Sequence, residues 1–292
     1  MPFFYRDETK ELNELTRQEA GGAFVDLSDG VTHYELSQPE ADETVVLVHG
    51  FSTPYFIYDP TFEFLSASGL RVLRYDLFGR GFSDRPDTHY TIDLFVKQLD
   101  DLLRSLEVSR PVGLVGLSMG GPIAAVFTTR FPERVSKLVL IDPAGVRSAF
   151  PRLALKIATM PAVGEAILSL IGTGGMLKAI ASDLLDRLYV EQFQSRYLVQ
   201  MQYKGFRHAI LSTVRHGMLD SFMDAYQRVG KMDKPVLLFW GRQDHTVPFR
   251  HSQDLAKAIP RAELHVIENC GHIPHYEKPE EVNPILLKFL LN

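Results

Sequence analysis

The segment Gly116-Leu117-Ser118-Met119-Gly120 places a serine between two glycines. It follows the apolar run 112–115 and precedes a helical pattern over 123–130. A strand that turns sharply into a helix strains the corner residue, and the flanking glycines let the backbones pass closely. The serine hydroxyl is then held out at a helix N-terminus, which favours negative charge. We therefore predict Ser118 as the nucleophile of acyl transfer; a tight structural turn with an incidental serine is the alternative.

A serine hydroxyl at its ordinary pKa is a weak nucleophile and needs a neighbouring base. In a strand–turn–helix setting of this kind the acid and the base follow the serine in the order Asp, His. Asp244 follows the apolar run 236–240, and His272 follows the run 264–267. All three residues come just after predicted strands, so their loops can converge at one edge of a parallel sheet. We predict Ser118, Asp244 and His272 as a catalytic triad.

The chain has ten histidines, and we predict His272 as the base. His275 is the nearest rival, at the start of the last predicted helix. His245 adjoins the predicted acid and cannot readily face it, and His49 is expected to stabilise its own loop. His216 lies in a helical region where it could contact a substrate. The other histidines have no assigned role: His251, in a solvated helical stretch, and His33, His89, His208 and His265.

The predicted acid also has a rival. Asp142 follows the apolar run 137–141 and so reaches the same edge of the sheet. We favour Asp244. The alternative role for Asp142 is turn chemistry before Pro143, with its carboxylate bonded to nearby backbone amides.

The oxyanion that forms during acyl transfer needs hydrogen-bond donors, and backbone amides can supply them. We predict the N–H of Met119, the residue after the nucleophile, as one donor. The second is the N–H of Phe51, in the loop 48–52 after the first parallel strand, where Gly50 lets the chain approach. Losing one such donor typically costs on the order of 3 kcal/mol of transition-state stabilisation.

Short apolar runs that alternate with helical patterns must position these residues. Runs of about five apolar residues fit strands buried on both faces, so we predict a parallel, doubly wound α/β sheet. An antiparallel hairpin precedes it, with strands at 24–27 and 31–36 and a turn at 28–30. The predicted parallel strands are 44–48, 71–75, 112–117, 137–141, 236–240 and 264–267.

The strand rhythm breaks between residues 146 and 231, where the pattern is helical and rich in methionine. An insertion between two parallel strands sits over their carboxyl ends, where ligands bind. We predict a core domain of residues 1–145 and 232–292 and a helical cap of residues 146–231. Apolar cap residues either line a pocket or pack the cap's own helices: Phe150, Leu153, Ile157, Met160, Ile167, Leu170, Met176, Phe193, Met201, Phe206, Met218 and Phe222.

The composition excludes several classes of function. With 31 basic and 36 acidic residues the net charge is -5, which disfavours a nucleic-acid-binding surface. The single cysteine, Cys270, excludes an intrachain disulfide and a multi-cysteine zinc site, and no metal or organic cofactor is predicted. The N-terminus lacks the apolar run of an export signal, and charged and helix-breaking residues interrupt the most apolar stretch, 153–171. We predict a cytoplasmic protein without stable membrane insertion.

From roughly residue 23 to its end the chain resembles the α/β-hydrolase superfamily. The resemblance implies an eight-stranded, mostly parallel sheet flanked by helices, with a helical cap inserted after the sixth strand. It looks most like small bacterial esterases and lipases and their C–C-bond-hydrolase relatives. In such proteins the segment 76–84 is usually a structural loop. The matching segments are Val48 to Phe51, Tyr75 to Asp84, Gly116 to Gly121, Phe131 to Val135, Gly241 to Asp244, and Gly271-His272.

The predicted activity is a carboxylesterase or lipase-like hydrolysis of apolar esters with short- to medium-chain acyl groups. The single glycine after His49 resembles the branch that favours esters of unhindered alcohols. One alternative is a C–C bond hydrolase of the meta-cleavage diketone type, with the same triad and a cationic group for a carboxylated substrate. Another is a non-enzymatic ligand receptor on this fold. Haloalkane dehalogenases and epoxide hydrolases use an aspartate where this chain has Ser118. The cation candidates are Arg147, Arg152, Arg196, Arg207 and Arg215.

Overall fold

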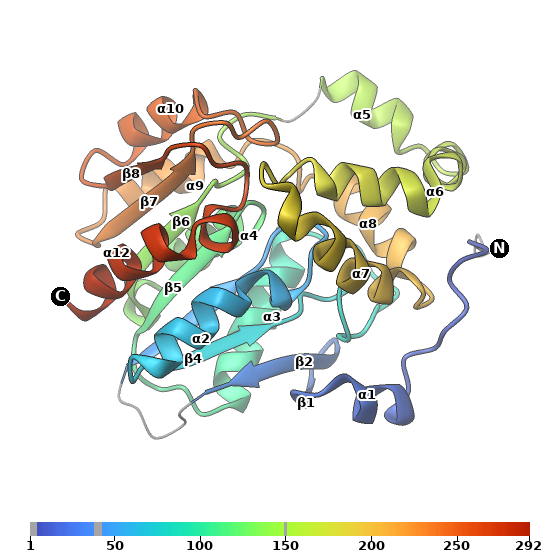
Figure 1. The fold of residues 1–292 in the computed structure, drawn as a ribbon, viewed down its shortest axis with the longest axis horizontal. Coiled ribbons are helices and arrows are strands. Elements are labelled where there is room, and N and C mark those ends of the chain that lie inside the picture. Colours follow the sequence, from blue (N-terminus) through green and yellow to red (C-terminus); the bar gives the residue numbers. More distant parts are fainter. Residues whose placement is uncertain (1–4, 38–42, 149–150) are drawn as a thin grey trace.

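A computed structural model describes residues 5–37, 43–148 and 151–292. Its centre is an eight-stranded sheet in the order β1-β2-β4-β3-β5-β6-β7-β8, which confirms the predicted sheet (Figure 1). The β1–β2 and β2–β4 pairs are antiparallel and the remaining pairs are parallel. The strands are β1 (Ala23–Leu27), β2 (Gly30–Leu36), β3 (Thr44–Val48), β4 (Arg71–Tyr75), β5 (Val112–Leu117), β6 (Val135–Ile141), β7 (Val236–Gly241) and β8 (Glu263–Ile267).

Helices cover both faces of the sheet (Figure 1), which is why every residue of β3, β5 and β7 is buried. One layer is α2 (Asp59–Ala67), α11 (Pro274–Glu277) and α12 (Pro279–Leu291). The other is α3 (Ile92–Ser105), α4 (Gly120–Arg130), α9 (Met223–Gly230) and α10 (His251–Ala258). The apolar stripe of α3 is buried in the core between this layer and the sheet at Leu94, Leu99, Leu102 and Leu103. Short helices fill connections: α1 (Glu14–Ala20), η1 (Tyr55–Tyr58), η2 (Pro132–Arg134) and η3 (Arg187–Tyr189).

Between β6 and β7 the described residues form helices and no strand. Helices α5 (Arg152–Ala158), α6 (Val163–Ala181), α7 (Val190–Met201) and α8 (Phe206–Arg215) gather at one end of the sheet (Figure 1). Helix α9 instead packs on α4 and α10 in the core layer. The division into core and cap stays a prediction, and we propose that the cap ends before α9.

The predicted apolar residues of the inserted region differ in burial, and Phe222 is partly buried against the core. Met176, Phe193, Met201, Phe206 and Met218 are buried. By contrast, a second set is exposed: Leu153, Ile157, Met160, Ile167 and Leu170. Phe150 lies outside the described residues.

Helix α6 changes one expectation from the sequence. The most apolar helix is Val163–Ala181, shifted from the predicted stretch 153–171, and by length and composition alone it could cross a membrane. Its most apolar stretch of 18 residues has a mean hydropathy of 1.3, and only 17% of that stretch is buried. Gly172 has φ 60° and ψ -177°, so the helix is broken at its middle. One such helix is weak support for a membrane span, and the cellular location stays a prediction.

The segment before β1, which lies outside the family resemblance, binds the inserted helices to the rest of the chain. The Glu8 carboxylate accepts hydrogen bonds from the N–H groups of Gly205 and Arg207, both at 2.8 Å, and so caps the N-terminus of α8. The N–H of Lys10 donates to the carbonyl of Gln202 at 2.8 Å. This arm therefore ties α8 to the N-terminal part of the chain.

Candidate active site

Ser118 lies at the turn from β5 into α4, as the sequence predicts. Its φ is 51°, in the left-handed region that side chains other than glycine rarely adopt. A side chain at Gly116 would come within 2.3 Å of the Gly120 carbonyl oxygen, and one at Gly120 within 2.2 Å of the Val48 carbonyl oxygen. The two glycines are therefore required by close backbone approach, and the turn they allow is that of a nucleophile elbow.

Asp244 and His272 lie in the loops after β7 and β8 and are joined directly. The His272 Nδ1 lies 2.7 Å from Oδ2 of Asp244. The other Asp244 oxygen accepts the N–H groups of Thr246 at 2.8 Å and Val247 at 2.9 Å. The carboxylate is thus held by three donors and directs the second ring nitrogen of His272, Nε2, away from itself.

The surroundings of this pair shift both pKa values in the direction that a catalytic pair needs. Burial disfavours the charged imidazole, but the negative charge of Asp244 and their hydrogen bond outweigh burial and raise the pKa of His272. Burial also opposes ionisation of Asp244, yet the charge of His272 and the hydrogen bond lower the pKa of that carboxyl. Both residues are 4% exposed and Ser118 is 8% exposed, so bulk water is largely excluded.

The loop after β3 lies beside Ser118. A side chain at Gly50 would come within 3.2 Å of the Ser118 Cβ and 3.7 Å of its Oγ. The next residue, Phe51, has its carbonyl oxygen fixed by Nε of Arg80 at 2.8 Å. This placement supports Phe51 and Met119 as oxyanion donors, and the assignment stays a prediction.

His49 stabilises this loop, as its position suggested. Its Nε2 accepts the N–H of Leu77 at 2.9 Å, so Nδ1 carries the proton and donates to the carbonyl of Gly50, also at 2.9 Å. Complete burial lowers the pKa of His49 to about 4, which keeps it neutral. His49 therefore has no free nitrogen for catalysis.

Arg80 was not singled out from the sequence. It is completely buried and donates to the carbonyls of Phe51 and Phe78 and to the hydroxyl of Thr213 in α8. Burial lowers the pKa of Arg80 to about 10, so it stays charged at neutral pH. The only sequence feature that could have indicated Arg80 was its position in the loop 76–84. Its hydrogen bonds link the Phe51 loop to the inserted helices.

The rival base, His275, does not contact Asp244. It is fully buried in α11 with its ring centroid 4.7 Å from that of Tyr58. Burial lowers the pKa of His275 to about 3. A neutral, enclosed imidazole of this kind fits a packing role.

None of the other histidines has a described hydrogen bond to the Asp244–His272 pair. His216 and His89 stack with ring centroids 4.0 Å apart, and with His208 they line a surface hollow of about 550 Å³. Both ring nitrogens of His33 face oxygens, those of Asp76 at 2.8 Å and Gly21 at 3.1 Å. This second buried His–Asp pair was missed, and it anchors the loop 76–84. The rest are peripheral: His245, exposed; His251, at the start of α10; and His265, beside Glu263.

Asp142, the rival acid, lies close to the pair without a hydrogen bond to His272 among the described contacts. Its Oδ1 accepts the N–H of Gly241 at 2.9 Å. The carboxylate of Asp142 therefore bonds a nearby backbone amide, as its alternative role predicts, and that amide lies at the end of β7.

One acidic residue that had no signal in the sequence, Glu277, holds the His272 loop. The Glu277 carboxylate accepts the N–H of Gly271 at 2.7 Å and of Asp186 at 2.7 Å, and it also bonds the N–H of Leu185. Its Oε1 also accepts the thiol of Cys270 at 3.3 Å. Burial raises the pKa of Cys270 far above its ordinary value, so this thiol is not a nucleophile.

Four of the arginines considered for substrate binding have acidic partners. Arg215 pairs with Glu165 at 2.8 Å, and Arg196 pairs with Asp59. The guanidinium of Arg207 lies 3.3 Å from Asp7 and 3.7 Å from Glu8, and that of Arg147 lies 2.7 Å from Asp254. The side chain of Arg152 lies outside the described part of the structure.

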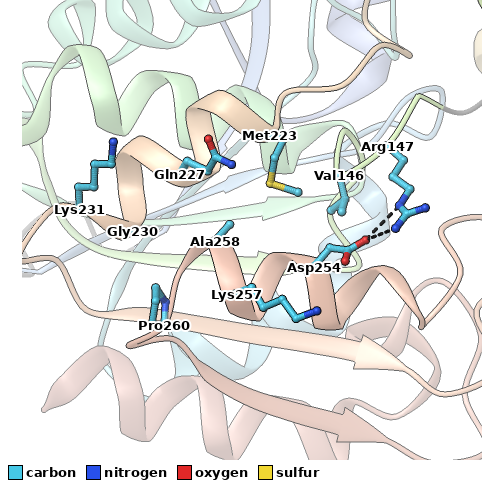
Figure 2. Close-up of a pocket in the computed structure, with 10 residues that line it drawn as sticks. All are labelled: Val146, Arg147, Met223, Gln227, Gly230, Lys231, Asp254, Lys257, Ala258 and Pro260. Carbon is cyan, nitrogen blue, oxygen red and sulfur yellow. Dashed lines mark hydrogen bonds and ion pairs between the residues drawn. The ribbon is translucent and has the colours of Figure 1, made fainter.

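A groove of about 570 Å³ runs between α9 and α10 (Figure 2). Figure 2 shows Arg147 turned toward Asp254, with Lys231 and Lys257 along the same groove. None of the predicted triad residues lines it. Arg147 therefore does not face the site around Ser118.

One group of side chains could hold a metal ion by geometry. A ligand atom each from Asp142, Asp244 and His272 lies within 4.8 Å of the others, the one such group in the part of the chain that the structure describes. The His272 Nδ1 already faces Asp244, so the same atoms fit an acid–base pair.

Comparisons with known proteins agree with this geometry. A sequence model of the alpha/beta hydrolase family matches residues 45–285. A protein of Cupriavidus pinatubonensis named 2-hydroxy-6-oxononadienedioate/2-hydroxy-6-oxononatrienedioate hydrolase is 30% identical over 300 residues. The match covers 97% of this chain and 100% of that protein.

Solved structures with the same fold include a meta-cleavage product hydrolase from Pseudomonas fluorescens. It has a TM-score of 0.76 and 26% identity, and the match covers 92% of this chain and 97% of that one. An esterase from Exiguobacterium antarcticum has a TM-score of 0.77 and 21% identity, covering 93% and 100% of the two chains. The second likeness shows the fold alone.

Proposed function

We propose, because this chain belongs to the alpha/beta hydrolase family, that it is a serine hydrolase that cleaves a C–C bond in a vinylogous diketone. The observation that carries the choice of bond is the relative that matches almost the whole chain and is named for such a substrate. Ester hydrolysis was the first prediction from the sequence, and C–C bond hydrolysis, its alternative, is now the preferred activity. The name of that relative also indicates a dicarboxylate as the substrate class.

The first step is attack by Ser118. Its Oγ forms a bond to the substrate carbonyl carbon while Nε2 of His272 takes the hydroxyl proton. Nε2 is the nitrogen available for this step because Nδ1 faces Asp244 at 2.7 Å. The N–H groups of Phe51 and Met119 bind the negative oxygen of the tetrahedral intermediate.

The C–C bond then breaks, and its electron pair leaves with the carbon fragment. A carbon leaving group needs an electron sink, which the conjugated second carbonyl supplies as a dienolate. The dienolate takes the proton from His272, and the acyl group stays on Ser118 as an ester. Water loses a proton to His272 and attacks this ester. The tetrahedral intermediate then releases a carboxylic acid, and His272 returns the proton to the departing Ser118 oxygen.

A carboxylesterase is the second candidate, and the cationic residues favour it. Each of the four described arginines that could bind a substrate carboxylate is paired with an acidic side chain. An ester with a neutral acyl group needs no such cation. The two candidates therefore differ in their need for a charged substrate.

The experiment compares substrates on one purified protein. We expect kcat/KM for a carboxylated vinylogous diketone, followed by loss of its absorbance, to exceed that for p-nitrophenyl butyrate by about tenfold or more. The methyl ester of the diketone tests the charge requirement. Faster turnover of p-nitrophenyl butyrate would establish the esterase in its place.

The matched variants test the roles of the residues. Ser118→Ala should abolish turnover of both substrates, whereas His275→Gln should retain it provided that the protein folds. Full activity in Ser118→Ala would reject the nucleophile. Loss of activity in a folded His275→Gln protein together with full activity in His272→Gln would reject the base.

A further inference from the structure

Asp142 and Asp244 form a pair of neighbouring carboxyl groups. They follow β6 and β7, which are hydrogen-bonded neighbours in the sheet. Asp142 has no exposed surface and Asp244 is 4% exposed. One carboxyl oxygen of each acid and a ring nitrogen of His272 lie within 4.8 Å of one another. The two acids therefore share one enclosed site.

The hydrogen-bond donors are divided unequally between the two acids. Asp244 receives two backbone N–H groups and the imidazole of His272. Asp142 receives only the N–H of Gly241, and its Oδ2 has no hydrogen-bond partner among the described residues. A buried carboxylate with one donor beside a second carboxylate is unfavourable, whereas a carboxylic acid there would supply the missing hydrogen bond.

The backbone fixes Asp142 in this position. Its φ is 42°, in the left-handed region, which a residue other than glycine keeps only where its surroundings hold it. Its N–H donates to the carbonyl of Phe239 at 3.0 Å, and its side chain accepts from Gly241. Both contacts are to β7, so the side chain of Asp142 is tied to the strand that carries Asp244.

The charged groups around Asp142 act in the same direction. Burial and the negative charge of Asp244 raise the pKa of Asp142 well above its ordinary value, and the charge of Glu277 adds to this. The other titratable groups that face this site are His272, the Cys270 thiol and Asp183, which lies near His272 and accepts the Thr246 hydroxyl at 2.5 Å. None of these supplies a donor to Asp142 among the described contacts.

We propose that Asp142 is a positioning residue that stays a neutral carboxylic acid and donates its proton in a hydrogen bond to Asp244. This bond holds the Asp244 carboxylate against Nδ1 of His272. It also draws negative charge away from His272, so that the imidazole is a weaker base than Asp244 alone would make it. The proposal rests on the proposed function only in taking His272 as the base.

The experiment measures kcat/KM against pH for three variants. The midpoint of the acid limb of each profile reports the protonation of His272 in the free enzyme. In Asp142→Asn the amide can donate to Asp244 and accept from Gly241, so we expect an unchanged midpoint and a rate within about threefold of the wild type. Asp142→Ala lacks the donor, so its midpoint should rise and its rate should fall about tenfold. Asp26→Asn, on the exposed side of β1, is the matched control.

If Asp142 were ionised, Asp142→Asn would remove a negative charge near His272 and lower the midpoint by about two pH units. That shift would overturn the proposal. So would an Asp142→Ala protein with the rate and pH profile of the wild type.

An infrared measurement on the resting protein tests the same point without any substrate. At neutral pH the wild-type minus Asp142→Asn difference spectrum should contain the carbonyl band of a protonated carboxyl group. A carboxylate band in its place would overturn the proposal. Because no turnover is needed, this result stands even if the diketone and the ester both fail as substrates, an outcome that would count against the proposed function alone.

Discussion

The backbone N–H of His272 donates to the carbonyl oxygen of Asp183 at 2.9 Å. Asp183 follows α6, so the loop that carries the candidate base is bonded directly to the inserted helices. The Glu277 carboxylate makes the same connection, because it bonds Gly271 on one side and Leu185 and Asp186 on the other. The position of His272 therefore depends on the inserted region as well as on β8.

Replacing Glu277 by glutamine should weaken this connection. The amide keeps one acceptor oxygen but turns its NH₂ group toward backbone donors, so we expect a loss of about 2–3 kcal/mol in the free energy of unfolding. We also expect kcat to fall about tenfold, since His272 loses its fixed position. Denaturant unfolding and steady-state kinetics measure both. Glu280→Gln, exposed in α12, is the control and should be neutral.

The pH dependence of activity should follow the raised pKa of His272. The base must be neutral to accept the serine proton, so kcat/KM is lost as the pH falls through the pKa of His272. Because Asp244 raises that pKa above 6.5, we expect the midpoint of the acid limb above pH 6.5. A midpoint at or below the ordinary value would contradict the pairing seen in the structure.

Cys270 should resist thiol reagents in the folded protein. It has no exposed surface, and burial raises the pKa of its thiol, so both access and thiolate are lacking. We expect no reaction with a disulfide reagent such as DTNB under native conditions and one reacting thiol after unfolding in guanidinium chloride. Rapid labelling of the native protein would show that the loop before His272 opens.

The N-terminal arm should contribute to stability through Glu8. This carboxylate caps α8 and is 9% exposed. Glu8→Ala leaves two helix N–H groups without a partner, so we expect a cost of about 1–2 kcal/mol in thermal unfolding. Glu11→Ala removes a more exposed ion pair with Lys204 and should cost less than about 0.5 kcal/mol. Equal effects of the two changes would refute the capping role.

Much of the site could be predicted because its signals are local. Gly116 and Gly120 bracket Ser118 in sequence, and the apolar runs before Ser118, Asp244 and His272 indicate where each loop begins. Parallel strands bring their carboxyl ends to one edge by the geometry of the fold. The elbow and the Asp244–His272 contact follow from these two facts, so little long-range information was needed.

Contacts between distant side chains could not be predicted in the same way. The pairing of Arg147 with Asp254, and of Arg207 with Glu8, depends on how separate helices and loops pack. The sequence left these arginines as candidates for a substrate carboxylate. Only the packed structure shows that acidic partners already occupy them.

The sequence by itself determined the sheet, the strained serine and the order of the acid and the base, because each depends on residues that are close together in the sequence. The tertiary structure decided the state of the groups around them. Whether a carboxyl such as Asp142 or an imidazole such as His275 is charged depends on the water excluded and the charges brought near it by remote segments. Those quantities belong to the packed molecule and have no local signal in the chain.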